Sequence, residues 1–132
     1  MATPKDVVLR YVDAFNRGAL DELCAQFAPD ALVHGVLGWG SIEQVRPVWR
    51  DLIDCFNINL QVDAIIAEDE RVAVRYTERG QSVRSFRGLP VTGLGYEVAA
   101  MEWFELRDGL IYRRWGARDS AAQYRQMGLP LS

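Results

Sequence analysis

The spacing of the apolar residues changes near the middle of this chain. In the first part, apolar side chains recur three and four positions apart, which is typical of amphipathic helices. From Phe56 onward, apolar and polar residues alternate over long stretches, as they do in strands with one buried face. The pattern therefore predicts helices first and a sheet afterwards.

Three helices are expected before the change of period. The first begins after Thr3, an N-cap residue followed by proline, and ends at Gly18, which suits a left-handed C-cap. The second is short and is broken at residues 28–30, Ala-Pro-Asp. The third follows Ser41, which forms a capping-box pattern with the glutamine three residues later, and runs to about Asp54.

The rest of the chain predicts long strands with short connections. Residues 35–40 and 87–95 are expected to be loops, because glycine and proline interrupt them. Strands are expected at residues 31–34, 56–66, 72–77, 96–107 and 110–118, followed by a short helix from 119 to about 128.

The last two strands are joined by Asp108-Gly109, a dipeptide typical of tight hairpins because both residues tolerate a positive φ. If these are the two turn residues, Glu102 lies opposite Trp115, and Glu102 and Asp119 share one mostly apolar face with Phe104. A carboxylate on such a face needs either a partner or a chemical role.

Together these elements predict a single α+β domain over residues 1–132, with the three N-terminal helices packed on a strongly curved, mainly antiparallel sheet. A twisted sheet wrapped around helices forms a cone. The mouth of that cone is a natural pocket for a small hydrophobic ligand.

Composition argues against several classes of function. Hydrophobic residues make up 49% of the 132 and charged residues 25%, as in ordinary globular proteins, and the net charge of −3 argues against nucleic-acid binding. No apolar run is long enough to span a bilayer, and the N-terminus lacks a signal-peptide pattern, so we expect no membrane partner and a cytoplasmic location. A single histidine and two isolated cysteines exclude a multi-histidine metal site, and no metal is expected.

Several segments, in this order, resemble one family. They are Arg-Tyr-Val-Asp-Ala-Phe-Asn-Arg-Gly at 10–18, Gly-Leu-Pro-Val-Thr-Gly at 88–93, Trp-Phe-Glu-Leu-Arg-Asp-Gly-Leu-Ile at 103–111 and Trp-Gly-Ala-Arg-Asp at 115–119. This order resembles the SnoaL-like polyketide cyclase (ester cyclase) family, within the nuclear transport factor 2-like, cystatin-like superfamily. The resemblance covers nearly the whole chain and implies a cystatin-like cone and a reaction without any cofactor.

The resemblance also implies roles for particular residues. In characterised members, one acidic side chain takes a proton from a carbon between carbonyls and returns it to the forming alkoxide. Asp119 matches the family's catalytic aspartate by its position four residues after Trp115, and Glu102 lies where relatives often carry a pocket-facing His or Asp. His34 is the further candidate to assist. The residues expected to line the pocket are Tyr11, Trp39, Trp49, Phe104 and Trp115.

Each candidate also has a structural interpretation. Asp119 precedes a helix, where aspartate is a favoured N-cap, and Glu102 can be neutralised by an arginine. His34 can be a structural strand-end histidine, and Tyr11 a core tyrosine. Ketosteroid isomerases share the implied fold, and their donor pair matches Tyr11 and Glu102. Their general base, however, falls at Gly35, so that mechanism is not expected here.

The leading hypothesis is therefore a cofactor-free acid/base enzyme, of the cyclase or isomerase type, acting on a small hydrophobic carbonyl compound. The alternatives are a non-catalytic small-ligand-binding domain and an epoxide-opening hydrolase, which would need an Asp-Arg-Asp set around a water. Met101 and Trp103 are expected on the outer face of the sheet, which suggests a homodimer through that face.

Overall fold

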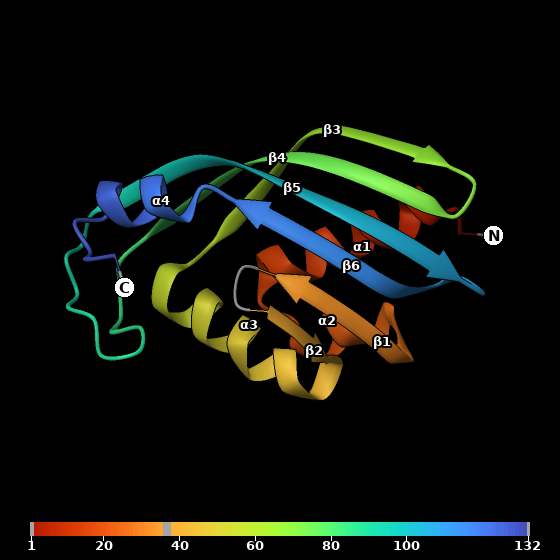
Figure 1. Ribbon diagram of the computed structural model, residues 1–132, viewed down its shortest axis with the longest axis horizontal. Coiled ribbons are helices and arrows are strands. Elements are labelled where there is room, and N and C mark those ends of the chain that lie inside the picture. Colours follow the sequence, from red (N-terminus) through yellow and green to blue (C-terminus); the bar gives the residue numbers. More distant parts are fainter. Residues whose placement is uncertain (1, 36–37, 132) are drawn as a thin grey trace.

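A curved six-stranded sheet with helices on its concave side forms the fold (Figure 1). The computed structural model describes residues 2–35 and 38–131. The elements in chain order are α1 (Pro4–Arg17), α2 (Leu20–Ala25), β1 (Phe27–Gly35), β2 (Gly38–Ser41), α3 (Ile42–Phe56), β3 (Asn59–Glu68), β4 (Arg71–Gln81), β5 (Gly95–Arg107), β6 (Leu110–Arg118) and α4 (Ser120–Gln126). This is the α+β architecture that the change of period predicts.

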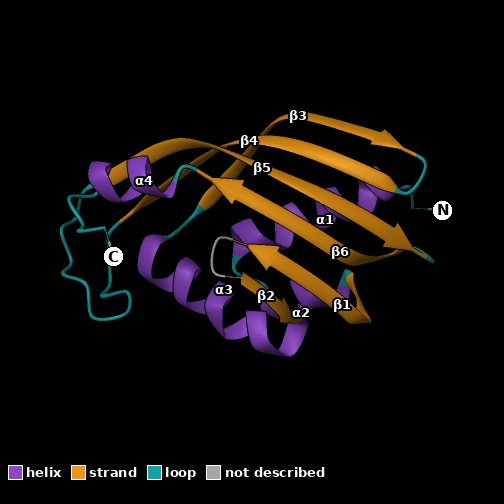
Figure 2. Cartoon of the chain, viewed as in Figure 1, coloured by secondary structure: helices purple, strands orange, loops and turns teal. Residues whose placement is uncertain are grey.

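The sheet order is β2-β1-β6-β5-β4-β3, and only the β1–β6 pair is parallel among the pairs described. The prediction of a mainly antiparallel sheet is thus confirmed. Figure 2 shows α1, α2 and α3 together on one side of the sheet, while α4 lies at the end where β5 begins and β6 ends. The apolar faces of sheet and helices meet in one core between these layers.

The helix ends follow their sequence signals. Thr3 caps α1 through a capping box with Asp6, and Gly18 ends it with φ 69°. Ser41 forms the predicted capping box with Gln44 at the start of α3, which continues past its internal proline to Phe56. No helix in the described part of the chain is both long and apolar enough to cross a membrane.

Two strands depart from the prediction in the first half of the sheet. β1 begins at Phe27, four residues before the expected start, so that the Ala-Pro-Asp breaker lies inside a strand and coincides with an irregular register against β6. β2 lies in the glycine-rich stretch expected to be a loop, and its Trp39 is the register partner of His34. Residues 36 and 37 of that stretch lie outside the described residues.

The hairpin turn is confirmed but the register behind it is not. Asp108 and Gly109 have φ values of 53° and 79°, as a two-residue hairpin loop requires. Leu106 pairs with Ile111, but the next pair joins Glu105 to Arg113, so β6 carries one extra residue, Tyr112. This is a β-bulge.

Beyond the bulge, each residue of β6 lies on the opposite face of the sheet from the one expected. Beyond it, Glu102 lies opposite Gly116 and Trp103 lies opposite Trp115. The expected pairing of Glu102 with Trp115 was therefore wrong, because a shift of one residue moves each side chain to the other face of the sheet. On the concave face, Gly116 takes the place opposite Glu102 that was expected for Trp115, and Arg114 lies opposite Phe104.

Candidate functional site

A cavity of about 390 Å³ lies between the concave face of the sheet and helices α1 and α3. Its volume falls in the range of pockets that hold small molecules. The apolar part of its lining includes Tyr11, Phe15, Val45, Trp49, Leu52 and Leu60. The charged residues of the lining are Glu78, Arg87, Glu102, Arg114 and Arg118.

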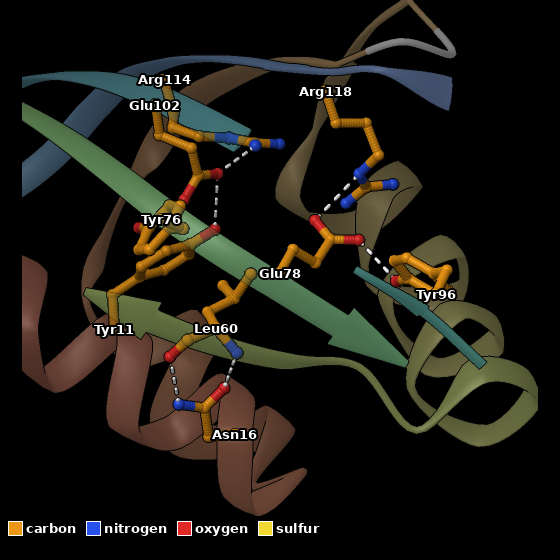
Figure 3. Close-up of polar contacts among 9 residues, drawn as sticks. All are labelled: Tyr11, Asn16, Leu60, Tyr76, Glu78, Tyr96, Glu102, Arg114 and Arg118. Atoms are coloured by element: carbon orange, nitrogen blue, oxygen red, sulfur yellow. Dashed lines mark hydrogen bonds and ion pairs between the residues drawn. The ribbon is translucent and has the colours of Figure 1, made fainter. Parts of the chain in front are cut away.

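Glu102 is the centre of one polar cluster in this cavity. The hydroxyl of Tyr11 donates to its Oε2 at 2.9 Å, and the hydroxyl of Tyr76 donates to its Oε1 at 2.7 Å (Figure 3). Arg114 donates from Nη1 to Oε2 and forms an ion pair with the carboxylate. Three donors from three different elements thus converge on a carboxylate that is only 9% exposed.

These three donors reach Glu102 because the helical and strand periods place each of them on the face of its element that points to the cavity. Tyr11 lies on the buried stripe of α1, and Tyr76 and Arg114 lie on the concave faces of the strands on either side of β5. Gly116 makes room for the guanidinium. A Cβ at Gly116 would lie well inside contact distance of Nη1 and 3.3 Å from Cζ of Arg114, so only glycine leaves space for this ion pair.

Electrostatics keep the donors of this cluster protonated. Burial and the neighbouring charge of Glu102 raise the pKa of Tyr11 and of Tyr76 well above the ordinary value. Burial is the largest single effect on Arg114 and would lower its pKa, but the interactions with Glu102, Tyr11 and Tyr76 together outweigh it and the pKa is raised. Two neutral phenols and one guanidinium cation therefore face the carboxylate.

A second cluster lies along the sheet at Glu78 (Figure 3). This carboxylate is fully buried, accepts from the hydroxyl of Tyr96 at 2.5 Å and accepts from Nε of Arg118 at 3.0 Å. Burial and the charge of Glu78 raise the pKa of Tyr96. The sequence reasoning missed Glu78 and Arg118, although continuing the alternation past Thr77 would have placed Glu78 on the concave face.

The structure brings four of the predicted site residues to the cavity: Tyr11, Trp39, Trp49 and Glu102 line it. Phe104 is not among the described lining residues. It is fully buried, and its ring packs edge-on against Tyr11 with the ring centroids 5.2 Å apart. Its contribution is to support the tyrosine that contacts Glu102.

Asp119 lies at the start of α4 and not among the described lining residues. Its Oδ1 accepts a hydrogen bond from the backbone N–H of Ala122 at 2.9 Å, which is N-cap geometry. The structure thus shows the capping contact, and a catalytic role for Asp119 stays a prediction from the family resemblance.

His34 and Trp115 lie on the outer face of the sheet. They line a groove there together with Met101 and Trp103. Trp39 joins this group, with its ring centroid 4.7 Å from that of His34 and 5.7 Å from that of Trp115. The expected position of Trp115 on the concave face was wrong by one residue of register, and His34 is not among the described residues that line the cavity.

Within residues 2–35 and 38–131, no group of three or more His, Cys, Asp and Glu side chains is arranged to hold a metal ion. The polar chemistry of the cavity comes instead from glutamate, arginine and tyrosine side chains. Such a set can exchange protons with a bound molecule and can donate hydrogen bonds to its oxygen atoms.

The concave sheet, the three helices and the enclosed polar cavity define a protein of the cystatin-like α+β class. Residues 8–114 match the model of the SnoaL-like domain, so the chain belongs to the SnoaL-like family. No curated protein sequence matches it.

Solved structures agree with this assignment. IdmH from Streptomyces antibioticus, described as a candidate polyketide cyclase, is 28% identical with a TM-score of 0.85, over 96% of this chain and 99% of that chain. A candidate polyketide cyclase from Silicibacter sp. is 29% identical with a TM-score of 0.85, over 93% of each chain. AclR from Streptomyces galilaeus, described as a candidate hydroxylase, is 24% identical with a TM-score of 0.85 over 95% of each chain, and shows the shared fold alone.

Proposed function

We propose that this protein is a cofactor-free acid/base enzyme, of the cyclase or isomerase type, that acts on a small hydrophobic carbonyl compound. The observation that carries the proposal is the Glu102 carboxylate, which faces a largely apolar cavity and is fixed by three donors. A carboxylate held in one orientation beside an apolar ligand site is suited to move a proton to and from carbon.

The hydrogen-bond pattern points to one oxygen of Glu102 as the proton acceptor. Oε2 accepts from both Tyr11 and Arg114, whereas Oε1 accepts only from Tyr76 among the described residues. A carboxylate oxygen can accept two hydrogen bonds, so Oε1 retains capacity for a proton. In the proposed step, Oε1 takes a proton from the carbon beside the substrate carbonyl, and the electron pair of the C–H bond forms the enolate.

One of the two tyrosines would then stabilise the enolate oxygen. Once Glu102 is protonated, it carries no negative charge and no longer requires two phenol donors. The hydroxyl of Tyr11 or Tyr76, which the raised pKa keeps protonated, can turn from Glu102 to the enolate oxygen. Glu102 then returns its proton: to another carbon of the enolate in isomerisation, or to the alkoxide oxygen that forms when the enolate carbon attacks a second carbonyl and closes a ring.

The comparisons support the cyclase form of this chemistry. The two structures that are 28% and 29% identical to the chain are both described as candidate polyketide cyclases. Ring closure by an enolate needs a cavity that folds a flexible substrate and excludes water, and the lining by Phe15, Trp49 and Leu52 meets that need.

Solvent deuterium exchange tests the proposal without knowledge of the natural substrate. The protein is incubated in D₂O with 2-tetralone or ethyl benzoylacetate, and proton NMR follows loss of the signal next to the carbonyl. We expect the wild-type protein to accelerate exchange and Glu102→Gln to lower that rate by roughly 100-fold or more, as for loss of a general base. Glu97→Gln, an exposed change on the outer face of the same strand, is the matched control and should keep the wild-type rate.

The second candidate is a non-catalytic ligand-binding domain. The observation that favours it is that both carboxylates of the described cavity lining are paired with arginines, Glu102 with Arg114 and Glu78 with Arg118. Binding of 2-tetralone with no acceleration of exchange would support this candidate and would contradict the enzymatic proposal.

A further inference from the structure

Arg118 presents a hydrogen-bonding group to the cavity that the proposed proton transfer does not use. Arg114 and Arg118 are four residues apart on β6, so both side chains lie on the concave face, with their Cα atoms about 13 Å apart. Figure 3 shows the two arginines in separate clusters, Arg114 at Glu102 and Arg118 at Glu78. The cavity therefore has two distinct polar ends.

The second cluster fixes the orientation of Arg118. Both oxygens of the buried Glu78 are occupied, one by Tyr96 and the other by Nε of Arg118. Within the described residues, the two terminal nitrogens of Arg118 donate no hydrogen bond, and neither is completely buried. The guanidinium is thus held by its inner edge while its outer fork stays open, which is the geometry for a carboxylate ligand.

A second cation without a partner among the described residues lines the same cavity. Arg87, from the loop between β4 and β5, lines the cavity, packs over the ring of Phe86 at 5.0 Å and has no carboxylate partner among the described residues. The charged lining consists of three arginines and two glutamates, so the cavity carries one positive charge in excess. A ligand with one negative charge would balance it.

We propose that Arg118 and Arg87 bind a carboxylate group of the substrate, and that Glu78 is the positioning residue that holds Arg118. The substrate class is then a hydrophobic carbonyl compound with one carboxylate, whose reacting carbon lies at the Glu102 end of the cavity. This inference rests on the proposed function, because it assumes that the same cavity holds the substrate.

The test compares 2-naphthoate with 2-naphthamide, a neutral molecule of nearly the same shape. Binding to each is measured by titration calorimetry, with wild-type protein and with Arg87→Gln, Arg10→Gln and the double variant Arg118→Gln/Glu78→Gln. The double variant removes both charges of the buried pair, because Arg118→Gln alone would leave Glu78 buried without a cation. Arg10, exposed on α1 and outside the described lining, controls for the change of net charge.

We expect the wild-type protein to bind 2-naphthoate at least 10-fold more tightly than 2-naphthamide, as one charge-assisted fork contact provides. The double variant should lose this preference, Arg87→Gln should reduce it severalfold, and Arg10→Gln should retain it. The affinity for 2-naphthamide should be the same for the wild-type protein and all three variants, which would also show that each variant is folded.

Equal affinity of the wild-type protein for the two probes would overturn the inference, and so would a preference that survives in both the double variant and Arg87→Gln. Because binding is measured without turnover, this result is independent of the deuterium-exchange assay. A protein that prefers the carboxylate but does not accelerate exchange would contradict the proposed acid/base chemistry alone.

Discussion

The substitution Gly116→Ala tests how the sequence maintains the Glu102 cluster. The glycine has no positive φ, so alanine fits its backbone, and the added methyl group would meet only the outer end of the Arg114 side chain and, at 3.5 Å, Oε2 of Glu102. A flexible side chain can move away from a methyl group at little steric cost. The expected effect is therefore the displacement of Arg114 from Glu102, not strain in the sheet.

The size of the expected loss in stability follows from the ion pair between Arg114 and Glu102. Removing one partner of a buried pair costs about 3–5 kcal/mol, and displacement costs less because Arg114 remains present and can reach solvent through the cavity. Replacing glycine by alanine also stabilises the folded state by about 0.4–1 kcal/mol through the unfolded chain. We expect a net loss of about 2 kcal/mol in the free energy of unfolding, measured by urea denaturation with tryptophan fluorescence.

Gly35→Ala is the matched control for this experiment. Its Cβ would lie 3.7 Å from Nη2 of the same Arg114, an ordinary contact that requires no displacement, so its stability should change by less than about 1 kcal/mol. When Glu102→Gln is already present, Gly116→Ala should lower the free energy of unfolding by less than it does in the wild-type protein, because the ion pair is already absent. If Gly116→Ala is as stable as Gly35→Ala and exchanges deuterium at the wild-type rate, the space at position 116 does not maintain the cluster and the reasoning is refuted.

Three further predictions follow from other parts of the structure. Asp119→Ala should lower the free energy of unfolding by about 1 kcal/mol through loss of the N-cap, and Asp119→Asn, which keeps an acceptor, should restore most of it; equal stability of the two variants would contradict the capping role. Because the pKa values of Tyr11, Tyr76 and Tyr96 are raised in the folded state, the unfolded chain binds fewer protons above about pH 10, so stability should fall there by up to roughly 4 kcal/mol per pH unit. In a Tyr76→Phe variant, the free energy of unfolding from urea titrations should fall less steeply with pH above about pH 10. An unchanged slope would show that Tyr76 does not contribute to the fall. The apolar outer face predicts a homodimer, with a mass by light scattering of about twice 14.9 kDa that Trp103→Lys reduces to the monomer value; a monomeric wild-type protein would contradict it.

The fold could be predicted from the sequence because its signals are local. The capping residues, the change of period and the Asp108-Gly109 turn each depend on neighbours within a few residues, and each corresponds to an observed element. The bulge at Tyr112 has no such local signal. It adds one residue to β6 relative to β5, and it decides whether Arg114 or Trp115 faces the cavity.

The candidate site could be predicted only in part for the same reason. Glu102 was found because β5 alternates without interruption, so its face could be assigned. An arginine partner was one of the two interpretations left open for Glu102, and its identity as Arg114 depends on the bulge and on the space left by Gly116. The second cluster at Glu78 joins residues from three elements, and no spacing in the sequence shows that they meet.

The central claim is that Glu102, in the cavity, moves the proton. The most direct test measures deuterium exchange into 2-tetralone in parallel for the wild-type protein, Glu102→Gln and Asp119→Asn, each checked for folding by urea denaturation. We predict a fall of roughly 100-fold or more for Glu102→Gln and a rate within about threefold of wild type for Asp119→Asn, which retains the capping acceptor. A near-normal rate for Glu102→Gln together with a large loss for Asp119→Asn would contradict the account and assign the chemistry to Asp119.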